Sequence, residues 1–435
     1  MIVILLVVAA VLLPALIWRI GVSREARMLL AAREAAGQPL TMAQLNERFP
    51  VPAEGENGAE LYREALKTYR DLPPDKVDSL LWMGKSRPVP GEALDPVVRE
   101  STLEWLGVNA VTLEKVKAAA GRKQSRYVTP YQPAGYNDLS VLDRLEVLAD
   151  LTCAAAVLFA DSDDGGATSE ALAHALALAR SPEQDGLYST LARQWAFEEQ
   201  FLEALQYCLS RTEVAESVLQ SVETHFEAGR RLDQVRHMVV VEQCLFLGRV
   251  REGRRRGMPR NILIATGVGD LNIGAHTRLM GEILDWTNAP VADRPTIERR
   301  FDAEMKNLSK RAMLFLTVNV SRPPGYWSYY RKSLDQAALA RSAMAVRRYY
   351  LTQGRYPESL EALEPALPGA ERLLPSTGRS ITYTVDGGAA ELSNGVADVG
   401  MPAPASPGPG ERKAPTVSNP DSLRFVLLAP PADAP

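Results

Sequence analysis

The stretch LSVLDRLEVLADLTCAAAVLFA, residues 139–160, decides the fold of this 435-residue chain. It is strongly apolar and rich in leucine and alanine, over a length typical of a helix rather than a strand. Further helical patterns follow, with connections of only a few residues, at 169–180, 187–208, 213–226 and 232–250. Because such short connections make neighbouring helices antiparallel, we predict a mainly α protein, either a helical bundle or an irregular helical array.

The helical pattern also extends toward the N-terminus. Thr41, followed three residues later by Gln44, is typical of a capping box at the start of a short helix. Asn57 precedes an amphipathic helix, and prolines between residues 73 and 96 then divide the chain into short pieces. We assign residues 21–332 to one helical body.

Residues 1–18 contain no charged or strongly polar side chain, and Arg19 follows at once. As a helix, this run reaches about 27 Å, close to the thickness of the hydrocarbon core of a bilayer. No basic residue precedes it and no A-x-A site follows it, as a cleaved signal peptide would require. We therefore predict a transmembrane anchor over residues 1–20, in the cell (inner) membrane, with a cleaved signal peptide or a buried helix as alternatives.

The charges beside this run indicate its orientation. Arg19, Arg24 and Arg27 lie on the C-terminal flank, and no basic side chain lies on the N-terminal flank. The positive-inside rule then places the large domain in the cytoplasm. This prediction depends on Met1 being the true start, because a lost basic leader would reverse the orientation.

Composition restricts the function classes. The net charge is −4 and the isoelectric point is near 5.8, whereas a general nucleic-acid binder is strongly basic, so we expect no nucleic-acid partner. Cys153, Cys208 and Cys244 are odd in number and widely spaced, so they form neither a disulfide framework nor a zinc pattern. We interpret them as small core residues on the reducing side of the membrane.

No residue pattern predicts a catalytic, cofactor-binding or metal-binding site. The acidic turn at 161–166 resembles a calcium loop, but Leu172 stands where an EF-hand needs its glutamate. The four histidines lack ligand spacing, and no serine stands in a G-x-S-x-G elbow.

Two pairs of glutamates suggest paired carboxylates. They are Glu198 with Glu199 and Glu203 with Glu242. Because glutamates on helices usually face solvent, we interpret all four as surface residues.

A basic segment lies at residues 249–260, where glycines and a proline predict a loop rather than a helix. Such a loop could dock on anionic lipid headgroups, each basic residue contributing about 1 kcal/mol near the surface. The alternative is an ordinary solvated loop. The arginines that would contact an anionic surface are Arg249, Arg251, Arg254, Arg255, Arg256 and Arg260.

The C-terminal quarter predicts a small α+β subdomain. A helix over 334–352 precedes strand patterns at 381–385 and 390–393, with a turn at 386–388 between them. A last strand is expected at 423–428. We divide this region into a helix plus β-hairpin at 333–400, a linker rich in proline, glycine and serine at 401–421, and a final strand and tail at 422–435.

The segment RRYYLTQGRYPESLEALEP, residues 347–365, resembles the stretch after the long helix in type II secretion pseudopilins. It departs from that family because no peptidase-site glycine precedes the apolar N-terminal run and about three hundred residues separate that run from the motif. The whole layout is similar to a group of uncharacterised membrane-anchored bacterial proteins, which implies no activity. The pseudopilin resemblance rests on Tyr349, Gly354, Tyr356, Pro357, Leu360, Leu363 and Gly395.

The same segment has a structural interpretation. Gly354 is expected to cap the helix, Tyr356 to pack back on it, and Pro357 to stop its propagation. Leu360 and Leu363 would close the core under the sheet. Upstream, the aromatic cluster at 326–330 either lies at a membrane interface or joins the helical body to the tail.

Together these features predict a single-pass membrane protein that serves as an interaction or scaffold module and binds a protein partner. An alternative is a membrane-tethered hydrolase whose site is assembled from scattered carboxylates and arginines. A third interpretation is a divergent secretion-system or pseudopilin-related envelope component, with the soluble part outside the cytoplasm.

Overall fold

The computed structural model describes residues 2–84, 86–132, 140–255, 268–312, 326–364, 366–386, 388–395 and 423–428. Within these ranges, the side chains of residues 2–12, 15, 251–255, 268, 308–312, 326, 328 and 370 are outside the description. The linker predicted at 401–421 also lies outside the described residues.

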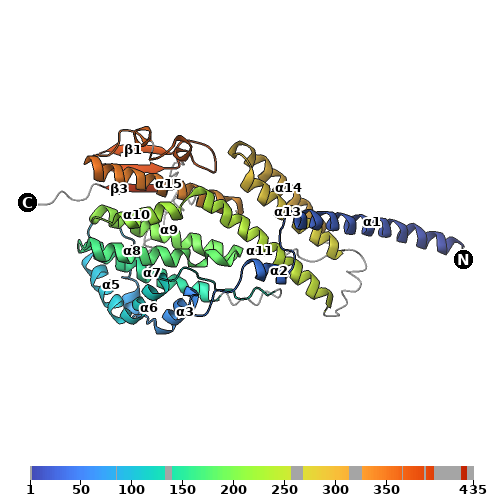
Figure 1. Ribbon diagram of the computed structural model, residues 1–435, viewed down its shortest axis with the longest axis horizontal. Helices are drawn as coiled ribbons and strands as arrows, with labels where there is room; N and C mark the ends of the chain where they lie inside the picture. Colours follow the sequence, from blue (N-terminus) through green and yellow to red (C-terminus); the bar gives the residue numbers. More distant parts are fainter. Residues whose placement is uncertain are drawn as a thin grey trace, which may run out of the picture.

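The described chain is mainly helical, with a small antiparallel sheet at its C-terminal end (Figure 1). This confirms the predicted fold class at that level. The helices are α1 (Ile2–Ala35), α2 (Met42–Arg48), α3 (Gly58–Thr68), α4 (Pro74–Val77), α5 (Pro96–Val108), α6 (Ala110–Ala120), α7 (Ser140–Asp161), α8 (Gly165–Arg180), α9 (Tyr188–Arg211), α10 (Glu216–His225), α11 (Ala228–Arg255), α13 (Val268–Asn288), α14 (Arg294–Ala312) and α15 (Tyr326–Gln353). Short 3-10 turns lie at η1 (Ser181–Asp185), η2 (Val291–Asp293), η3 (Leu360–Leu363) and η4 (Gly369–Arg372), and the strands are β1 (Thr382–Asp386), β2 (Ala389–Ser393) and β3 (Arg424–Leu428).

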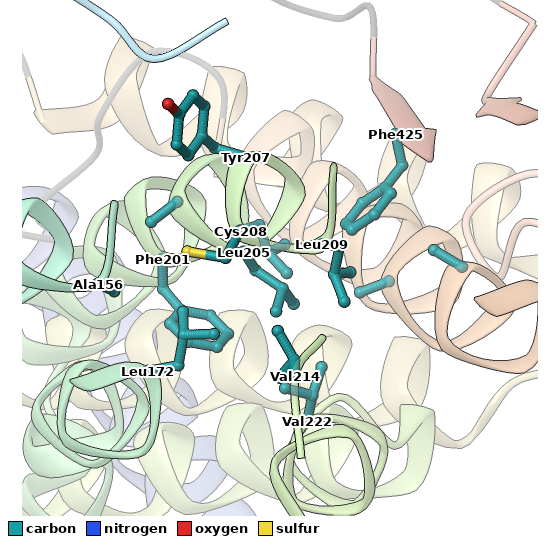
Figure 2. Close-up of a cluster of buried hydrophobic side chains, with 14 of the residues drawn as sticks. Ala156, Leu172, Phe201, Leu205, Tyr207, Cys208, Leu209, Val214, Val222 and Phe425 are labelled. Carbon is teal, nitrogen blue, oxygen red and sulfur yellow. The ribbon is translucent and has the colours of Figure 1, made fainter. Parts of the chain in front are cut away.

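The largest core cluster lies where α7, α8, α9 and α10 meet. α7 packs on both α8 and α9, and its alanines allow close approach between the helices. Figure 2 shows Phe201 and Leu205 of α9 pointing among Leu172, Val214 and Val222. All three cysteines are buried in the core, as the sequence predicts.

The sheet rests on α15 and α9 and shares the largest core. Strands β1 and β2 pair from Thr382 with Ser393, and β2 and β3 pair from Ala389 with Leu428, both antiparallel. Phe425 of β3 points into the core beside α9 (Figure 2). Gln206 of α9 accepts a hydrogen bond from the backbone N–H of Val426 at 2.9 Å, which fixes β3 to the helical body.

The segment after α15 folds back on that helix. The N–H of Gly354, at φ 67°, donates to the Tyr350 carbonyl at 2.8 Å, a conformation that glycine adopts without strain. The ring of Tyr356 lies 4.6 Å from that of Tyr350, and the hydroxyl of Tyr383 donates to the Pro357 carbonyl at 2.9 Å. Leu360 and Leu363 are buried in the same cluster as the strands.

An aromatic cluster joins α15 to the rest of the body. Trp327 and Tyr330 are buried against Trp286 of α13, with ring centroids 5.4 and 6.2 Å from it, and against Trp195 of α9. Trp327 and Tyr330 therefore join α15 to the helical body and do not lie at a membrane interface. Tyr329 is exposed.

Helix α1 is continuous from Ile2 to Ala35, with Pro14 inside it. Its N-terminal half projects away from the body (Figure 1). No helix, over the side chains that are described, is long and apolar enough to cross a membrane. The anchor predicted at 1–20 falls mostly on residues whose side chains are outside the description, so it stays a prediction.

The central position of α9 gives a stability prediction. Leu205 is fully buried, whereas Leu103 of α5 is 55% exposed. We expect Leu205→Ala to lower the free energy of unfolding by about 2–5 kcal/mol, because it leaves a cavity in the core. The same change at Leu103 should cost no more than about 0.5 kcal/mol. Urea unfolding of the full chain measures both, and equal losses would contradict the placement of α9.

Candidate functional site

Two adjoining clefts lie beside the loop at 121–131. The larger, about 620 Å³, extends from Arg48 and Phe49 to His237, and the smaller, about 470 Å³, lies between residues 120–125 and the end of α8. They share Gln124, Glu183, Gln184 and Arg230. Their volumes are within the range of small-molecule sites.

Asn57, the N-cap of α3, holds the loop in place. Its side-chain oxygen accepts from the N–H of Ala59 at 3.1 Å and of Arg126 at 2.9 Å, while its side-chain nitrogen donates to the Arg126 carbonyl at 2.9 Å. Gly58 must be glycine for this approach, since a Cβ there would lie 2.6 Å from Ser125 Oγ and 3.2 Å from the Gln124 carbonyl oxygen.

Asp185 of η1 fixes the other side of the same loop. One of its carboxylate oxygens accepts hydrogen bonds from the backbone N–H groups of Tyr127 and Val128, both at 2.9 Å. Burial raises the pKa of Asp185 to about 7, and these backbone hydrogen bonds offset part of that rise. The loop is thus tied to α3 and to η1, which makes the cleft wall rigid.

Arg126 and His237 line the larger cleft. The Arg126 guanidinium donates to the carbonyls of Phe49, Pro50 and Val128 and lies 4.5 Å from the centroid of the Tyr131 ring. The His237 ring lies 4.3 Å from the Phe49 ring. Burial lowers the pKa of His237 to about 4, and the charge of Arg126 acts in the same direction, so His237 is neutral at pH 7.

The smaller cleft is strongly positive. Its lining includes Arg122, Lys123, Arg180 and Arg230 and one acidic residue, Glu183. Arg230 binds both carboxylate oxygens of Glu183, at 3.0 and 2.6 Å, so that one cation and one anion neutralise each other. The three remaining cations give this cleft a net positive charge in a chain whose net charge is −4.

A buried ion cluster lies behind the clefts, where α9, α10 and α11 meet. One oxygen of Glu198 lies 2.5 Å from His225 Nε2 and accepts from Gln194 at 2.8 Å, and the other lies 2.6 Å from Arg231 Nη2. Burial opposes ionisation of Glu198, but Arg231 and His225 outweigh it and lower the pKa to about 2. Glu198 is 1% exposed, so its assignment to the surface was wrong.

The other three glutamates of the predicted pairs lie apart from this cluster. Glu199 is exposed and its carboxylate lies 2.9 Å from Lys332 Nζ. Glu203 accepts a hydrogen bond from the Trp82 indole at 2.9 Å, and Glu242 accepts from the Tyr188 N–H at 3.0 Å. Burial raises the pKa of both Glu203 and Glu242. Neither pair forms a joint carboxylate site.

The basic segment is helical through Arg255, which corrects the loop predicted from its glycines. α11 carries Arg249, Arg251, Arg254 and Arg255, and Gly253, the one glycine among residues 249–255, costs only about 1 kcal/mol relative to alanine. Arg249 is exposed. The side chains of Arg251, Arg254 and Arg255, and all of Arg256 and Arg260, lie outside the described residues.

The acidic residues at 161–164 make hydrogen bonds and ion pairs at the end of α7 and the start of α8. Asp161 accepts from the Tyr207 hydroxyl at 2.9 Å and lies 3.3 Å from Arg99, and Asp164 caps α8 through the N–H of Ala167 at 2.9 Å. Among the described residues, no group of histidine, cysteine, aspartate or glutamate side chains could hold a metal ion.

Sequence reasoning missed both clefts. The adjacent cations Arg122 and Lys123, next to Gly121 in a polar stretch, were the available signal. Neither Arg180 nor Arg230 belongs to a local motif, and only the fold brings them there. Compared with known proteins, the chain matches no family model, no curated protein and no solved structure.

The ion cluster predicts a large stability loss when one partner is removed. We expect Glu198→Gln to lower the free energy of unfolding by about 3–5 kcal/mol, because Arg231 is left as a buried charge without its carboxylate.

The control is the double variant Glu198→Gln with Arg231→Met, which removes both charges and should recover most of that loss. Denaturant unfolding of the full chain measures all three proteins. A double variant less stable than the single one would contradict the view that the unpaired charge causes the loss.

Proposed function

We propose that the protein is a membrane-anchored binding module, with the N-terminal half of α1 in the membrane and the body presenting its clefts beside it. The observation that carries this proposal is that α1 leaves the body beside the C-terminal end of α11, the helix that carries Arg249 to Arg255. The argument has three parts: how α1 is attached, what its free half exposes, and which charges surround its exit.

The C-terminal half of α1 is attached to α13. Ser23 Oγ donates to Asp270 at 2.5 Å, Glu25 forms an ion pair with Arg278, and Arg33 donates to the Thr277 carbonyl at 3.4 Å. Ser23 lies by Asp270, Ala26 by Gly274 and Arg33 by Gly281, so α1 and α13 run parallel. Ala26 also packs with Phe246 and Leu247 of α11 in a small core cluster.

The N-terminal half exposes apolar side chains. Leu13, Leu16 and Ile17 are 59%, 51% and 62% exposed, whereas Val22 and Ala26 are buried against the body. A water-exposed apolar helix face of this kind indicates a membrane or a partner protein. The uncharged sequence that continues to Met1 favours the membrane.

The basic segment lies on the same side. α11 and α13 are antiparallel, since Gln243 contacts Thr277 while Arg236 contacts Thr287. The C-terminal end of α11, which carries Arg249 to Arg255, therefore lies beside the start of α13, where α1 leaves the body (Figure 1). With Arg19, Arg24 and Arg27 it would face the anionic headgroups of the cytoplasmic leaflet.

Two ionisable side chains of the clefts, Glu183 and His237, are poorly suited to hydrolysis. A hydrolase needs a nucleophile or a general base that can exchange a proton near neutral pH. Glu183 is bound through both oxygens by Arg230, which holds its pKa below the ordinary value against the effect of burial. The pKa of His237, about 4, makes that ring a weak base.

A second candidate function is an envelope component related to secretion pseudopilins. The observation that favours it is the packing of a long helix, α15, against a small antiparallel sheet through the segment after Gly354. This function would place the body outside the cytoplasm.

Membrane attachment can be tested with charged substitutions in α1. We expect Leu6→Arg with Leu13→Arg to move the full chain from the membrane fraction to the soluble fraction, because each arginine costs about 2.5–3.5 kcal/mol near the bilayer centre. The matched control is Val97→Arg with Leu103→Arg on α5, at side chains 61% and 55% exposed. Carbonate-washed membranes measure the distribution, and equal behaviour of the two variants would overturn the anchor.

Orientation can be tested with paired reporters fused after Pro435, one active only in the cytoplasm and one only outside it. We expect the cytoplasmic reporter to be active, because the arginines lie on the body side of the apolar run. Activity of the outer reporter would contradict that orientation and favour the envelope component.

A further inference from the structure

The smaller cleft holds three cations that have no carboxylate partner of their own within ion-pair distance among the described residues. Within the described chain, Arg122, Lys123 and Arg180 form no ion pair and no side-chain hydrogen bond. Arg180 is half-buried at the end of α8, where its guanidinium has lost part of its hydration. A half-buried guanidinium without a carboxylate is energetically unfavourable unless an anion reaches it.

Its neighbours add to this cost. Burial lowers the pKa of Arg180, and the like charge of Arg230 lowers it further; the charges of Glu183 and Glu198 offset only part of this effect. The nearest acid in the cleft, Glu183, already binds Arg230 through both oxygens. Arg180 therefore lines the cleft with a charge that Glu183, shared with Arg230, balances only in part.

The wall that carries the other two cations is fixed before any ligand arrives. Arg122 and Lys123 follow Gly121, the C-cap of α6, and Gln124 and Ser125 line the same cleft. The N–H of Gly58 donates to the Gln124 carbonyl at 2.8 Å, and the N–H of Ser125 donates to Gln184 Oε1 at 3.2 Å. Binding at a wall held on two sides costs little ordering entropy.

We propose that this cleft is a binding site for a phosphate-bearing anion, which would contact the half-buried Arg180 and the exposed Arg122 and Lys123. Guanidinium groups bind phosphate oxygens through paired hydrogen bonds, and a phosphate group carries close to two negative charges at pH 7. Three cations without a partner among the described residues match the double charge of a phosphate ligand better than the single charge of a carboxylate ligand. The cleft volume, about 470 Å³, admits a small phosphorylated molecule or a lipid headgroup.

Among the described residues, none from α1 lines this cleft. The anion site can therefore be correct when the membrane anchor is wrong, and the reverse. The probe is inorganic pyrophosphate, titrated by calorimetry into the full chain in neutral detergent micelles at constant ionic strength. We expect saturable binding that Arg180→Gln weakens at least about tenfold, the effect of one lost charged hydrogen bond.

Two further variants make the result specific. Arg299→Gln removes the same charge from the exposed face of α14, where the side chain contacts only Pro295 and Thr296, and should leave binding unchanged. Arg122→Gln with Lys123→Gln changes only exposed side chains, so it tests the site even if Arg180→Gln fails to fold. Absence of saturable binding, or equal affinity in all cleft variants, overturns the proposal.

The source of the phosphate is separated by repeating the titration in lipid nanodiscs. If phosphatidylglycerol in place of phosphatidylcholine lowers the apparent affinity for pyrophosphate at an ionic strength high enough to screen the charge of the bilayer surface, a lipid headgroup occupies the cleft. If the affinity is the same in both lipids, the ligand is a soluble phosphorylated compound.

Discussion

Burial of α9 on nearly all sides is the constraint on which the rest of the structure depends. Leu205, Tyr207 and Cys208 have no exposed surface, although they point in different directions around the helix. α7 and α8 cover one side of α9, and the strand β3 and α15 cover another. A helix this deeply buried needs partners for its polar groups inside the protein. In α9, Glu198 finds them in its ion cluster and Gln206 binds the backbone of β3, whereas Gln194 Oε1 and Trp195 Nε1 have no hydrogen-bond partner among the described residues.

The sequence predicts the helices of this core because their signal is local. The run at 139–160 is long, apolar and uninterrupted, and it forms α7 almost to the residue. The strands are also predictable, since Asp386 and Gly388 mark a tight turn between alternating segments. Both signals depend on residues close together in the chain.

The candidate site could not be predicted in the same way. Asn57 and Arg126 are 69 residues apart in the sequence, and their contact forms one wall of the clefts. Glu198 looks like a surface glutamate until His225 and Arg231 are placed against it by two other helices. α11 continues through Gly253 because one glycine costs less than the packing of the helix on α13 contributes. In each case long-range packing outweighs the local pattern.

The continuity of α1 has a mechanical consequence. The same helix that projects from the body is held inside it by Ser23, Glu25 and Arg33, with no flexible linker between the two parts. A body on a rigid rod cannot swivel about its attachment as it would on a flexible tether. With the membrane attachment proposed above, the clefts would keep a fixed distance and a fixed angle to the bilayer, and this geometry would determine which neighbouring molecules can reach them.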